Sequence, residues 1–242
     1  AKAAIFTRAL ATGEKVAKAQ REGRSVGVID RARNAVGQKL ALGKVKAALG
    51  PNNPVIITGA APIGAEVLEF FYACGVPVLE GYGMTETCAA ATLNTLSEVR
   101  VGSVGRPLPG TEVSLGEDGE ILMKGPHVFK GYHRNQEATD EILEGGWLHS
   151  GDLGEIKDGY VFITGRKKDL IITSSGKNVS PEMLESALRE TRFISQAIAA
   201  GDRRSYLVAL VTLDPDEAPA LASSLGVSAD PESMATDEKV RE

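Results

Sequence analysis

Residue types that often build special sites are scarce in this chain of 242 residues. The two cysteines, Cys74 and Cys88, form no CxxC pair, and each has small or apolar neighbours. We expect free, buried thiols in a reducing compartment rather than a disulfide. The three histidines, His127, His133 and His149, do not have the spacing of metal ligands. The sequence therefore argues against a disulfide scaffold and gives no sign of a histidine metal site.

Long apolar runs and an excess of basic charge are also missing. No run approaches the ~18 apolar residues of a transmembrane helix, and the opening AKAAIFTRAL has no signal-peptide core or cleavage site. A net charge of −5 makes nonspecific nucleic-acid binding a poor hypothesis, although a local positive pocket could bind a small anion. We expect a cytoplasmic protein without a nucleic-acid partner. The missing initiator Met and the helical pattern at the start suggest a piece of a longer protein.

The remaining composition is that of a globular protein, with 43% hydrophobic and 24% charged residues. Residues 1–49 have apolar positions at helical spacing, and we expect the glycines at 23, 27, 37 and 43 to break this stretch into pieces. Basic residues recur between the apolar ones. They fit a solvated helix surface, and a lipid- or partner-binding face is the alternative.

An apolar, β-branched run at 55–58, a helical pattern at 63–74 and a short strand at 77–79 predict a parallel α/β unit. Alternating runs separated by glycine and proline then predict antiparallel strands. The predicted fold class is α/β plus α+β, in three parts. These are a parallel α/β subdomain at 1–92, an antiparallel β subdomain at 93–167, and a small, mobile and incomplete α+β lid domain at 168–242.

Two turns at the carboxyl ends of the predicted parallel strands, 58–62 and 80–87, are candidate ligand loops. In the second, Gly81 and Gly83 would let the backbone approach a ligand, and Tyr82 offers an aromatic face. Thr85 offers a hydroxyl, and Glu86 a hard oxygen ligand for Mg²⁺. The Thr-Glu-Thr run could equally cap a following helix. A phosphate or nucleotide loop and a plain helix cap therefore stay open.

The segment 150–185 combines an acidic Ser-Gly-Asp turn, the strand YVFIT, a basic Gly-Arg-Lys-Lys-Asp turn and a helix opened by Ser180 and Pro181. Asp152 suits ribose hydroxyls and Arg166 suits phosphate, because a guanidinium is a planar fork of donors. A polar hairpin around the Asp-Gly turn at 158–159 is the simpler interpretation. Trp147, the single tryptophan, is expected to fill a core rather than to stack on a base.

Four runs stand in order along the chain: EGYGMTET (80–87), GEILMKGPHVFKGY (119–132), GWLHSGDLG (146–154) and GYVFITGRKKDLIITSSGKNVSPEMLE (159–185). Together they resemble the adenylate-forming enzymes: acyl-CoA synthetases, luciferases and peptide-synthetase adenylation domains. The sequence VLEFFYACGVPVLEGYGMTET most resembles the long-chain fatty acyl-CoA synthetases. This resemblance implies that a fatty acid reacts with ATP to give an acyl-adenylate and pyrophosphate. Coenzyme A would then displace AMP.

The resemblance also implies roles for matching residues. Thr85 would contact phosphate oxygens and Glu86 would hold Mg²⁺, so both are candidate catalytic residues. Asp152 would accept the ribose hydroxyls, and Arg166 would contact the ribose and phosphate side. The remaining candidate nucleotide contacts lie around adenine: Gly59, Ala60, Ala61, Gly81, Tyr82 and Gly83.

In this family the small carboxyl-terminal domain rotates between the two half-reactions, which makes Lys168 the expected hinge. An ordinary surface lysine is the alternative. The turn Ser174, Ser175, Gly176 and Lys177 would then line the tunnel for coenzyme A. The chain has no run like the family's TSGTTGxPKG phosphate loop, and no match to its late catalytic lysine. We therefore expect little or no ligase activity from this chain alone, which ATP–pyrophosphate exchange would measure.

Several alternatives remain open at this stage. The acid could be aryl or medium-chain, the acceptor could be a carrier protein as in fatty acyl-AMP ligases, or the chain could be a non-catalytic nucleotide-binding module. The small residues Gly83, Ala89, Ala90 and Ala91 allow either room for an acyl chain or close packing. The expected partners are fatty acid, ATP and coenzyme A. A peripheral membrane contact is permitted by the basic amino-terminal helices but not required.

Overall fold

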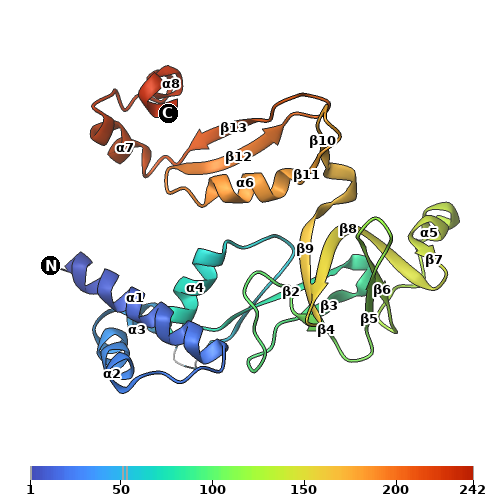
Figure 1. Cartoon of the computed structure of the whole chain (residues 1–242), viewed down its shortest axis with the longest axis horizontal. Coiled ribbons are helices and arrows are strands. Elements are labelled where there is room, and N and C mark those ends of the chain that lie inside the picture. Colours follow the sequence, from blue (N-terminus) through green and yellow to red (C-terminus); the bar gives the residue numbers. More distant parts are fainter. Residues whose placement is uncertain (1, 51, 53, 242) are drawn as a thin grey trace. The chain divides into compact units, whose positions relative to one another are not determined.

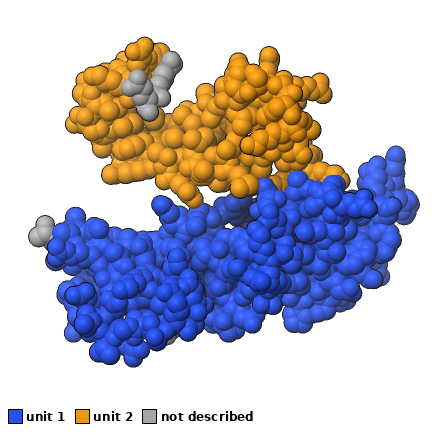
Figure 2. Space-filling model, viewed as in Figure 1, with its two compact units in different colours: residues 1–164 blue, residues 165–242 orange. Residues whose placement is uncertain are grey.

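The computed structural model describes residues 2–50, 52 and 54–241. The chain divides into two compact units, residues 1–164 and residues 165–242 (Figure 2). Strand β9 (Tyr160–Arg166) runs through the boundary between them. The subdomain boundaries at 92 and 167 stay predictions.

The first unit begins with helices. They are α1 (Lys2–Arg21), α2 (Val28–Gly37), the π-helical turn η1 (Gln38–Leu42) and α3 (Gly43–Ala48). The helical structure is interrupted between α1 and α2, as the glycines at 23 and 27 predict. It continues without interruption through Gly37 and Gly43, with a change to π-helical hydrogen bonding between them. At Gly37 a Cβ would lie 3.0 Å from the Ala9 Cβ, so this glycine allows α2 to approach α1 closely. The prediction that Gly37 and Gly43 interrupt the helix is wrong.

A strand–helix–strand unit follows (Figure 1). Strand β1 (Ile56–Thr58) pairs in parallel with β2 (Val78–Met84), and α4 (Ala65–Ala73) connects them. Strand β2 continues through residues 80–84, which we expected to form a loop. It turns at the 3₁₀ helix η2 (Thr85–Thr87) and pairs antiparallel with β3 (Ala89–Leu93). The Thr-Glu-Thr run is therefore the bend of a hairpin, and the helix-cap alternative is wrong.

Antiparallel strands make up the rest of the first unit. β4 (Arg106–Pro107) completes the sheet β1–β2–β3–β4. The second sheet contains β5 (Glu112–Leu115), β6 (Glu120–Lys124), β7 (Leu143–Glu144), β8 (Trp147–Lys157) and β9, with α5 (Gln136–Ile142) before β7. Asp158 and Gly159 have φ of 53° and 80°, as a two-residue turn between β8 and β9 requires. The predicted mixture of parallel and antiparallel sheet is confirmed.

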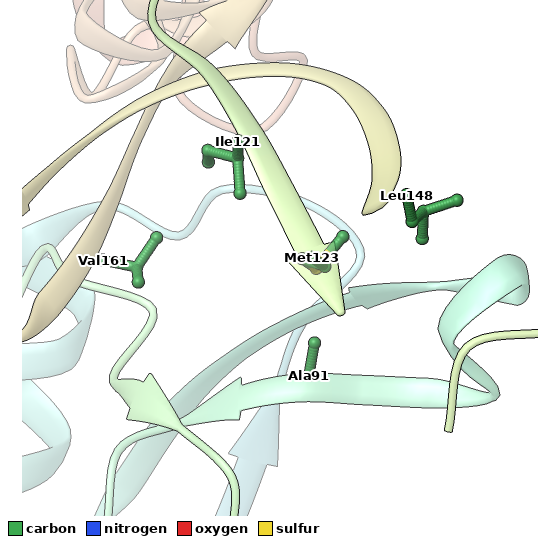
Figure 3. Close-up of a cluster of buried hydrophobic side chains, with 5 residues drawn as sticks. All are labelled: Ala91, Ile121, Met123, Leu148 and Val161. Carbon is green, nitrogen blue, oxygen red and sulfur yellow. The ribbon is translucent and has the colours of Figure 1, made fainter. Parts of the chain in front are cut away.

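The core of this part lies between the two sheets. Figure 3 shows its fully buried side chains, which come from β3, β6, β8 and β9: Ala91, Ile121, Met123, Leu148 and Val161. Trp147 is only half-buried, and its ring lies 5.7 Å from the Lys124 ammonium. Its neighbour Leu148 fills the core instead, because alternate residues of β8 point inward. The expectation that Trp147 fills a core is wrong.

The second unit has two small antiparallel pairs. β10 (Ile171–Ile172) pairs with β11 (Asn178–Val179), and β12 (Ile194–Ala200) pairs with β13 (Val208–Leu213). Helix α6 (Pro181–Arg189) packs on β12 and starts at Pro181, where a missing N–H costs no hydrogen bond. The 3₁₀ turn η3 (Lys167–Asp169) precedes β10, and α7 (Ala218–Leu225), α8 (Pro231–Thr236) and α9 (Glu238–Arg241) follow β13.

Two other expectations concern the thiols and the membrane. Cys74 and Cys88 are both free thiols, and Cys74 is buried, but Cys88 is exposed on the bend after η2. The expectation that both are buried is therefore wrong for Cys88. In the part of the chain that the structure describes, no helix is long and apolar enough to cross a bilayer.

Candidate functional site

Strands β1 and β2 bring the two candidate loops together, because Thr58 stands beside Glu80 in the parallel register. The turn that follows β1 contains Gly59, Ala60 and Ala61, and all three are exposed. A Cβ at Gly59 would lie 2.9 Å from the carbonyl oxygen of Gly81. The turn therefore lies against the middle of β2, next to the residue that precedes Tyr82.

The glycines of β2 allow β2 and β3 to pack closely in their hairpin. A Cβ at Gly83 would lie 1.7 Å from the carbonyl oxygen of Ala89, so no side chain fits between β2 and β3. At Gly81 a Cβ would come within 2.9 Å of the Leu93 side chain. Ala91 is part of the buried core. Close packing explains Gly83 and Ala91, whereas Ala89 and Ala90 are exposed.

Tyr82 and Asp152 meet directly. The Tyr82 hydroxyl donates to Oδ2 of Asp152 over 2.6 Å, although the two residues are 70 positions apart. Asp152 is 5% exposed, whereas Tyr82 is half-buried and packs its ring on the core that includes Ala91. The hydrogen bond from Tyr82 compensates part of the cost of burying the polar Asp152 side chain. The result is a fixed hydrogen-bond acceptor beside an aromatic ring.

The Ser-Gly-Asp turn is held by its own side chains and by β6. The Ser150 hydroxyl donates to the carbonyl of Ile121 over 2.7 Å, and it accepts from the Asp152 amide over 3.1 Å. Oε1 of Glu120 accepts from the Gly151 amide over 2.8 Å. Gly151 has φ of 71°, a conformation that glycine adopts without strain. These bonds fix the backbone that presents Asp152.

Glu86 forms a second pair, on the bend of the β2–β3 hairpin. The Tyr132 hydroxyl donates to Oε1 of Glu86 over 2.6 Å, and the Phe129 amide donates to the Glu86 carbonyl over 2.7 Å. The hydrogen bond to Glu86 raises the pKa of the Tyr132 phenol to about 12, so this group stays a donor at neutral pH. Thr85, the neighbour of Glu86, is exposed.

The remaining candidates belong to the second unit. Arg166, at the end of β9, and Lys168, in η3, are exposed. The turn 174–177 closes the β10–β11 hairpin, where the Lys177 amide donates to Oγ1 of Thr173 over 3.1 Å. Ser174, Ser175, Gly176 and Lys177 are all exposed. Their roles as nucleotide contact, hinge and tunnel lining stay predictions.

Two residues near the site escaped the sequence analysis. Tyr132 lies in the GPHVFKGY run, but nothing in the sequence links it to Glu86, 46 residues earlier. Glu80 precedes the glycine-rich stretch. Burial raises the pKa of its carboxyl to about 7, although Oε2 accepts from the Gly102 amide over 3.2 Å. The only feature of the sequence that could have indicated Glu80 is its place directly before the glycine-rich stretch.

Comparison with known proteins fits this geometry. A family model described as "AMP-binding enzyme" matches residues 4–133, which is more than half of the chain. The chain belongs to the AMP-binding enzyme family. A second model, "AMP-binding enzyme C-terminal domain", matches residues 168–226. The resemblance to adenylate-forming enzymes is confirmed.

Relatives of this AMP-binding enzyme chain carry names from lipid metabolism. It is 42% identical over 191 residues to the long-chain-fatty-acid–CoA ligase FadD15 of Mycobacterium bovis, covering 78% of this chain and 32% of the relative. It is 35% identical over 224 residues to long-chain-fatty-acid–CoA ligase 5 of Rattus norvegicus, covering 86% and 33%. The chain thus spans about a third of the length of these relatives.

A solved structure has the same fold over most of the chain. It is the O-succinylbenzoate coenzyme A synthetase (MenE) of Bacillus subtilis in complex with ATP and magnesium ion. The TM-score is 0.60 at 31% identity, and the match covers 71% of this chain and 40% of the synthetase. Its name refers to an aromatic acid, whereas the relatives above are named for long-chain fatty acids.

Proposed function

We propose that this chain is part of an AMP-forming fatty acid–CoA ligase, in which it binds the nucleotide. The carrying observation is the buried Asp152 side chain, which accepts from Tyr82, the residue after the glycine that the 59–61 turn lies against. Family membership and the long-chain-fatty-acid–CoA ligases among the relatives support the proposal. The reaction would convert a fatty acid and ATP into an acyl-adenylate, then into the coenzyme A thioester.

Asp152 fits the ribose of ATP. A carboxylate has about four lone-pair directions, and its two oxygens suit the two hydroxyl donors of a ribose. Its backbone is fixed by Ser150, so the acceptor is positioned before the nucleotide arrives. The Tyr82 ring and the turn of Gly59, Ala60 and Ala61 would lie on either side of the adenine base.

Glu86 fits Mg²⁺ when the nucleotide supplies the other ligands. Among the described residues no three His, Cys, Asp or Glu side chains form a metal cluster. Magnesium typically binds one or two carboxylates and completes its shell with water and phosphate oxygens. The ion, when bound, would neutralise phosphate charge that develops in the transition state. Tyr132 orients the Glu86 carboxylate, and the exposed Thr85 hydroxyl would contact phosphate oxygens.

The second unit would contribute to both half-reactions. Arg166 would contact the ribose and phosphate side of the nucleotide, and Lys168 would act as the hinge of the small domain. The exposed turn from Ser174 to Lys177 would then line the tunnel for coenzyme A. The family model for the carboxyl-terminal domain of AMP-binding enzymes matches this chain from Lys168 onward, and this match supports the assignment.

Nucleotide binding can be measured on the chain itself. Calorimetric titration with AMP, which carries the base and ribose, is expected to show binding by the 242-residue protein. Asp152→Asn should weaken binding by at least about tenfold, because it removes a charged acceptor. Asp140→Asn, on an exposed residue of α5, is the matched control and should leave binding unchanged. Equal affinities for the Asp152 and Asp140 variants would contradict the site.

The acid substrate needs a separate experiment on the full-length protein that contains this segment. AMP release with coenzyme A would be compared for palmitic, octanoic and benzoic acids. Preference for palmitic acid supports the long-chain assignment, which the names of the relatives favour. Preference for benzoic acid would support the aryl alternative, which the O-succinylbenzoate synthetase favours. Adenylate formation without thioester would indicate a fatty acyl-AMP ligase, and AMP binding without turnover a non-catalytic module.

A further inference from the structure

Strand β8 bulges out of its pairing with β6 at the Ser-Gly-Asp turn. The antiparallel register places residues 150–152 of β8 opposite Ile121 alone, three residues against one. A bulge of this kind interrupts the ladder of backbone hydrogen bonds and turns a side chain in a new direction. Asp152 belongs to this bulge, and its side chain reaches Tyr82 on the other sheet. The direction of the Asp152 side chain therefore depends on how the bulge is held.

Two side chains take the place of the interrupted backbone bonds. The Ser150 hydroxyl donates to the carbonyl of Ile121, whose own side chain lies in the buried core (Figure 3). Oε1 of Glu120 accepts from the Gly151 amide over 2.8 Å. Ser150 is part of the bulge itself, whereas Glu120 lies on β6, 31 positions before Gly151. Glu120 therefore ties the middle of the bulge to the neighbouring strand.

The Glu120 side chain is itself fixed. The residue is only 6% exposed. Its second carboxyl oxygen, Oε2, lies 3.2 Å from Nδ1 of His149, and its backbone amide donates to Oδ1 of Asp118 over 3.1 Å. Because its backbone and both of its carboxyl oxygens have partners, Glu120 has little freedom to turn away from Gly151.

Packing alone does not explain a glutamate at this position. Burying a carboxyl group costs free energy that an apolar side chain of similar size would not. Methionine has about the same length and would fill the same space. What methionine could not supply is the acceptor for the Gly151 amide. Residues that cost stability in this way are expected next to functional sites.

We propose that Glu120 is a positioning residue for nucleotide binding, which acts on Asp152 through the Gly151 amide. The proposal rests on the function proposed above, in which Asp152 accepts the ribose hydroxyls. Gly151 and Asp152 are neighbours in the chain, so a shift of the bulge would move the Asp152 carboxyl group away from both hydroxyls. Hydrogen bonds weaken steeply as their distance and angle depart from the optimum. Glu120 itself does not contact the nucleotide, since both of its carboxyl oxygens face protein groups.

Two ligands separate positioning from general stabilisation. AMP carries the ribose hydroxyls that Asp152 would bind, and 2′,3′-dideoxy-AMP lacks them. In calorimetric titrations of the 242-residue chain, Glu120→Met should weaken AMP binding about tenfold and dideoxy-AMP binding less than about twofold, because only the hydrogen bonds to the hydroxyls are lost. Glu120→Asp, which is one methylene too short to reach Gly151, should act in the same direction.

A conservative variant and a control complete the series. Glu120→Gln keeps a carbonyl oxygen for the Gly151 amide, so it should bind AMP within about threefold of the unchanged chain. Glu112→Met, at an exposed glutamate of β5, should leave both affinities unchanged. Circular dichroism checks that each variant is folded.

A double-mutant cycle tests whether Glu120 acts through Asp152. In an Asp152→Asn chain, Glu120→Met should lower the AMP affinity by less than about threefold, because the carboxyl group that Glu120 positions is already lost. Hydrogen exchange of the Gly151 amide, followed by NMR, needs no nucleotide. Exchange should be slow in the unchanged chain and in Glu120→Gln, and fast in Glu120→Met.

The outcomes distinguish this role of Glu120 from the proposed function itself. Equal losses of AMP and dideoxy-AMP affinity in Glu120→Met would overturn the positioning role, since Glu120 would then support the fold alone. Full AMP affinity in that variant, or fast exchange of the Gly151 amide in the unchanged chain, would overturn it too. An Asp152→Asn chain that binds AMP as tightly as the unchanged chain would instead overturn the proposed function, and the role of Glu120 with it.

Discussion

Tyr82 on β2 donates its phenolic hydrogen to Oδ2 of Asp152 on β8, over 2.6 Å. The bond joins the sheet that carries the glycine-rich stretch to the sheet that carries the Ser-Gly-Asp turn. Because Asp152 is buried, this pair both stabilises the fold and sets the position of the acceptor we assign to ribose.

Tyr82→Phe should therefore destabilise the chain. The substitution keeps the ring in the core but removes a hydrogen bond to a buried carboxylate, which is worth about 1–3 kcal/mol. Urea denaturation followed by circular dichroism measures the loss. Tyr206→Phe, at an exposed tyrosine of the second unit, serves as the control and should be neutral. A Tyr82→Phe protein as stable as the control would mean that the bond contributes nothing to folding.

Glu80 should make stability depend on pH between its ordinary pKa of 4.5 and its folded-state pKa of about 7. Burial favours the neutral carboxyl, so the folded chain binds more protons than the unfolded chain within this window. Stability contributed by this group is complete below the window and is lost as the pH rises through it.

Glu80→Gln should remove this dependence, and above the window it should stabilise the chain by about 1–2 kcal/mol once solvent screening is allowed for. The check is the free energy of unfolding in urea at several pH values. Glu112→Gln, at an exposed glutamate of β5, should leave the pH profile unchanged. A profile identical in the Glu80 and Glu112 variants would contradict the assignment.

Gly83→Ala should disrupt the β2–β3 hairpin. Its Cβ would stand 1.7 Å from the Ala89 carbonyl oxygen, which belongs to the backbone and cannot rotate away. We expect a loss of about 3 kcal/mol or more, since overpacking against backbone must move a strand. Thermal melting of Gly27→Ala gives the comparison, because Gly27 has φ of −61° and nothing within 4 Å of a Cβ. Similar melting temperatures would show that the hairpin tolerates the clash.

Arg21 should contribute far more to the stability of the fold than Arg24, three residues later in the chain. The Arg21 side chain is 12% exposed, its Nη2 contacts both Glu69 oxygens at 2.5 Å, and its guanidinium lies 4.3 Å from the centre of the Tyr72 ring. Arg21→Met leaves Glu69 without this partner and should cost about 2–3 kcal/mol. Arg24 is 61% exposed and pairs with Glu22, so Arg24→Met should change stability by less than about 0.5 kcal/mol. Chemical denaturation of both variants measures the difference, and equal losses would contradict this ranking.

Local sequence signals located most elements correctly. The helices α4 and α6 and the Asp-Gly turn at 158–159 lie where periodicity and turn residues place them. Such signals work because they are encoded within a few residues. The failures at Gly37, Trp147 and residues 80–84 share one cause, since each depends on what packs against the residue from elsewhere in the chain.

The sequence by itself determined the order of motifs and hence the family, because residue types at fixed spacings carry the chemistry of a site. Only the tertiary structure decided which of these residues meet. Tyr82 reaches Asp152, and Tyr132 reaches Glu86, through side-chain contacts between segments that are 70 and 46 residues apart in the chain. It also decided that α2 turns its aliphatic side outward. A helical pattern fixes which residues share a face, but the close approach of Gly37 to Ala9 selects the face that is buried.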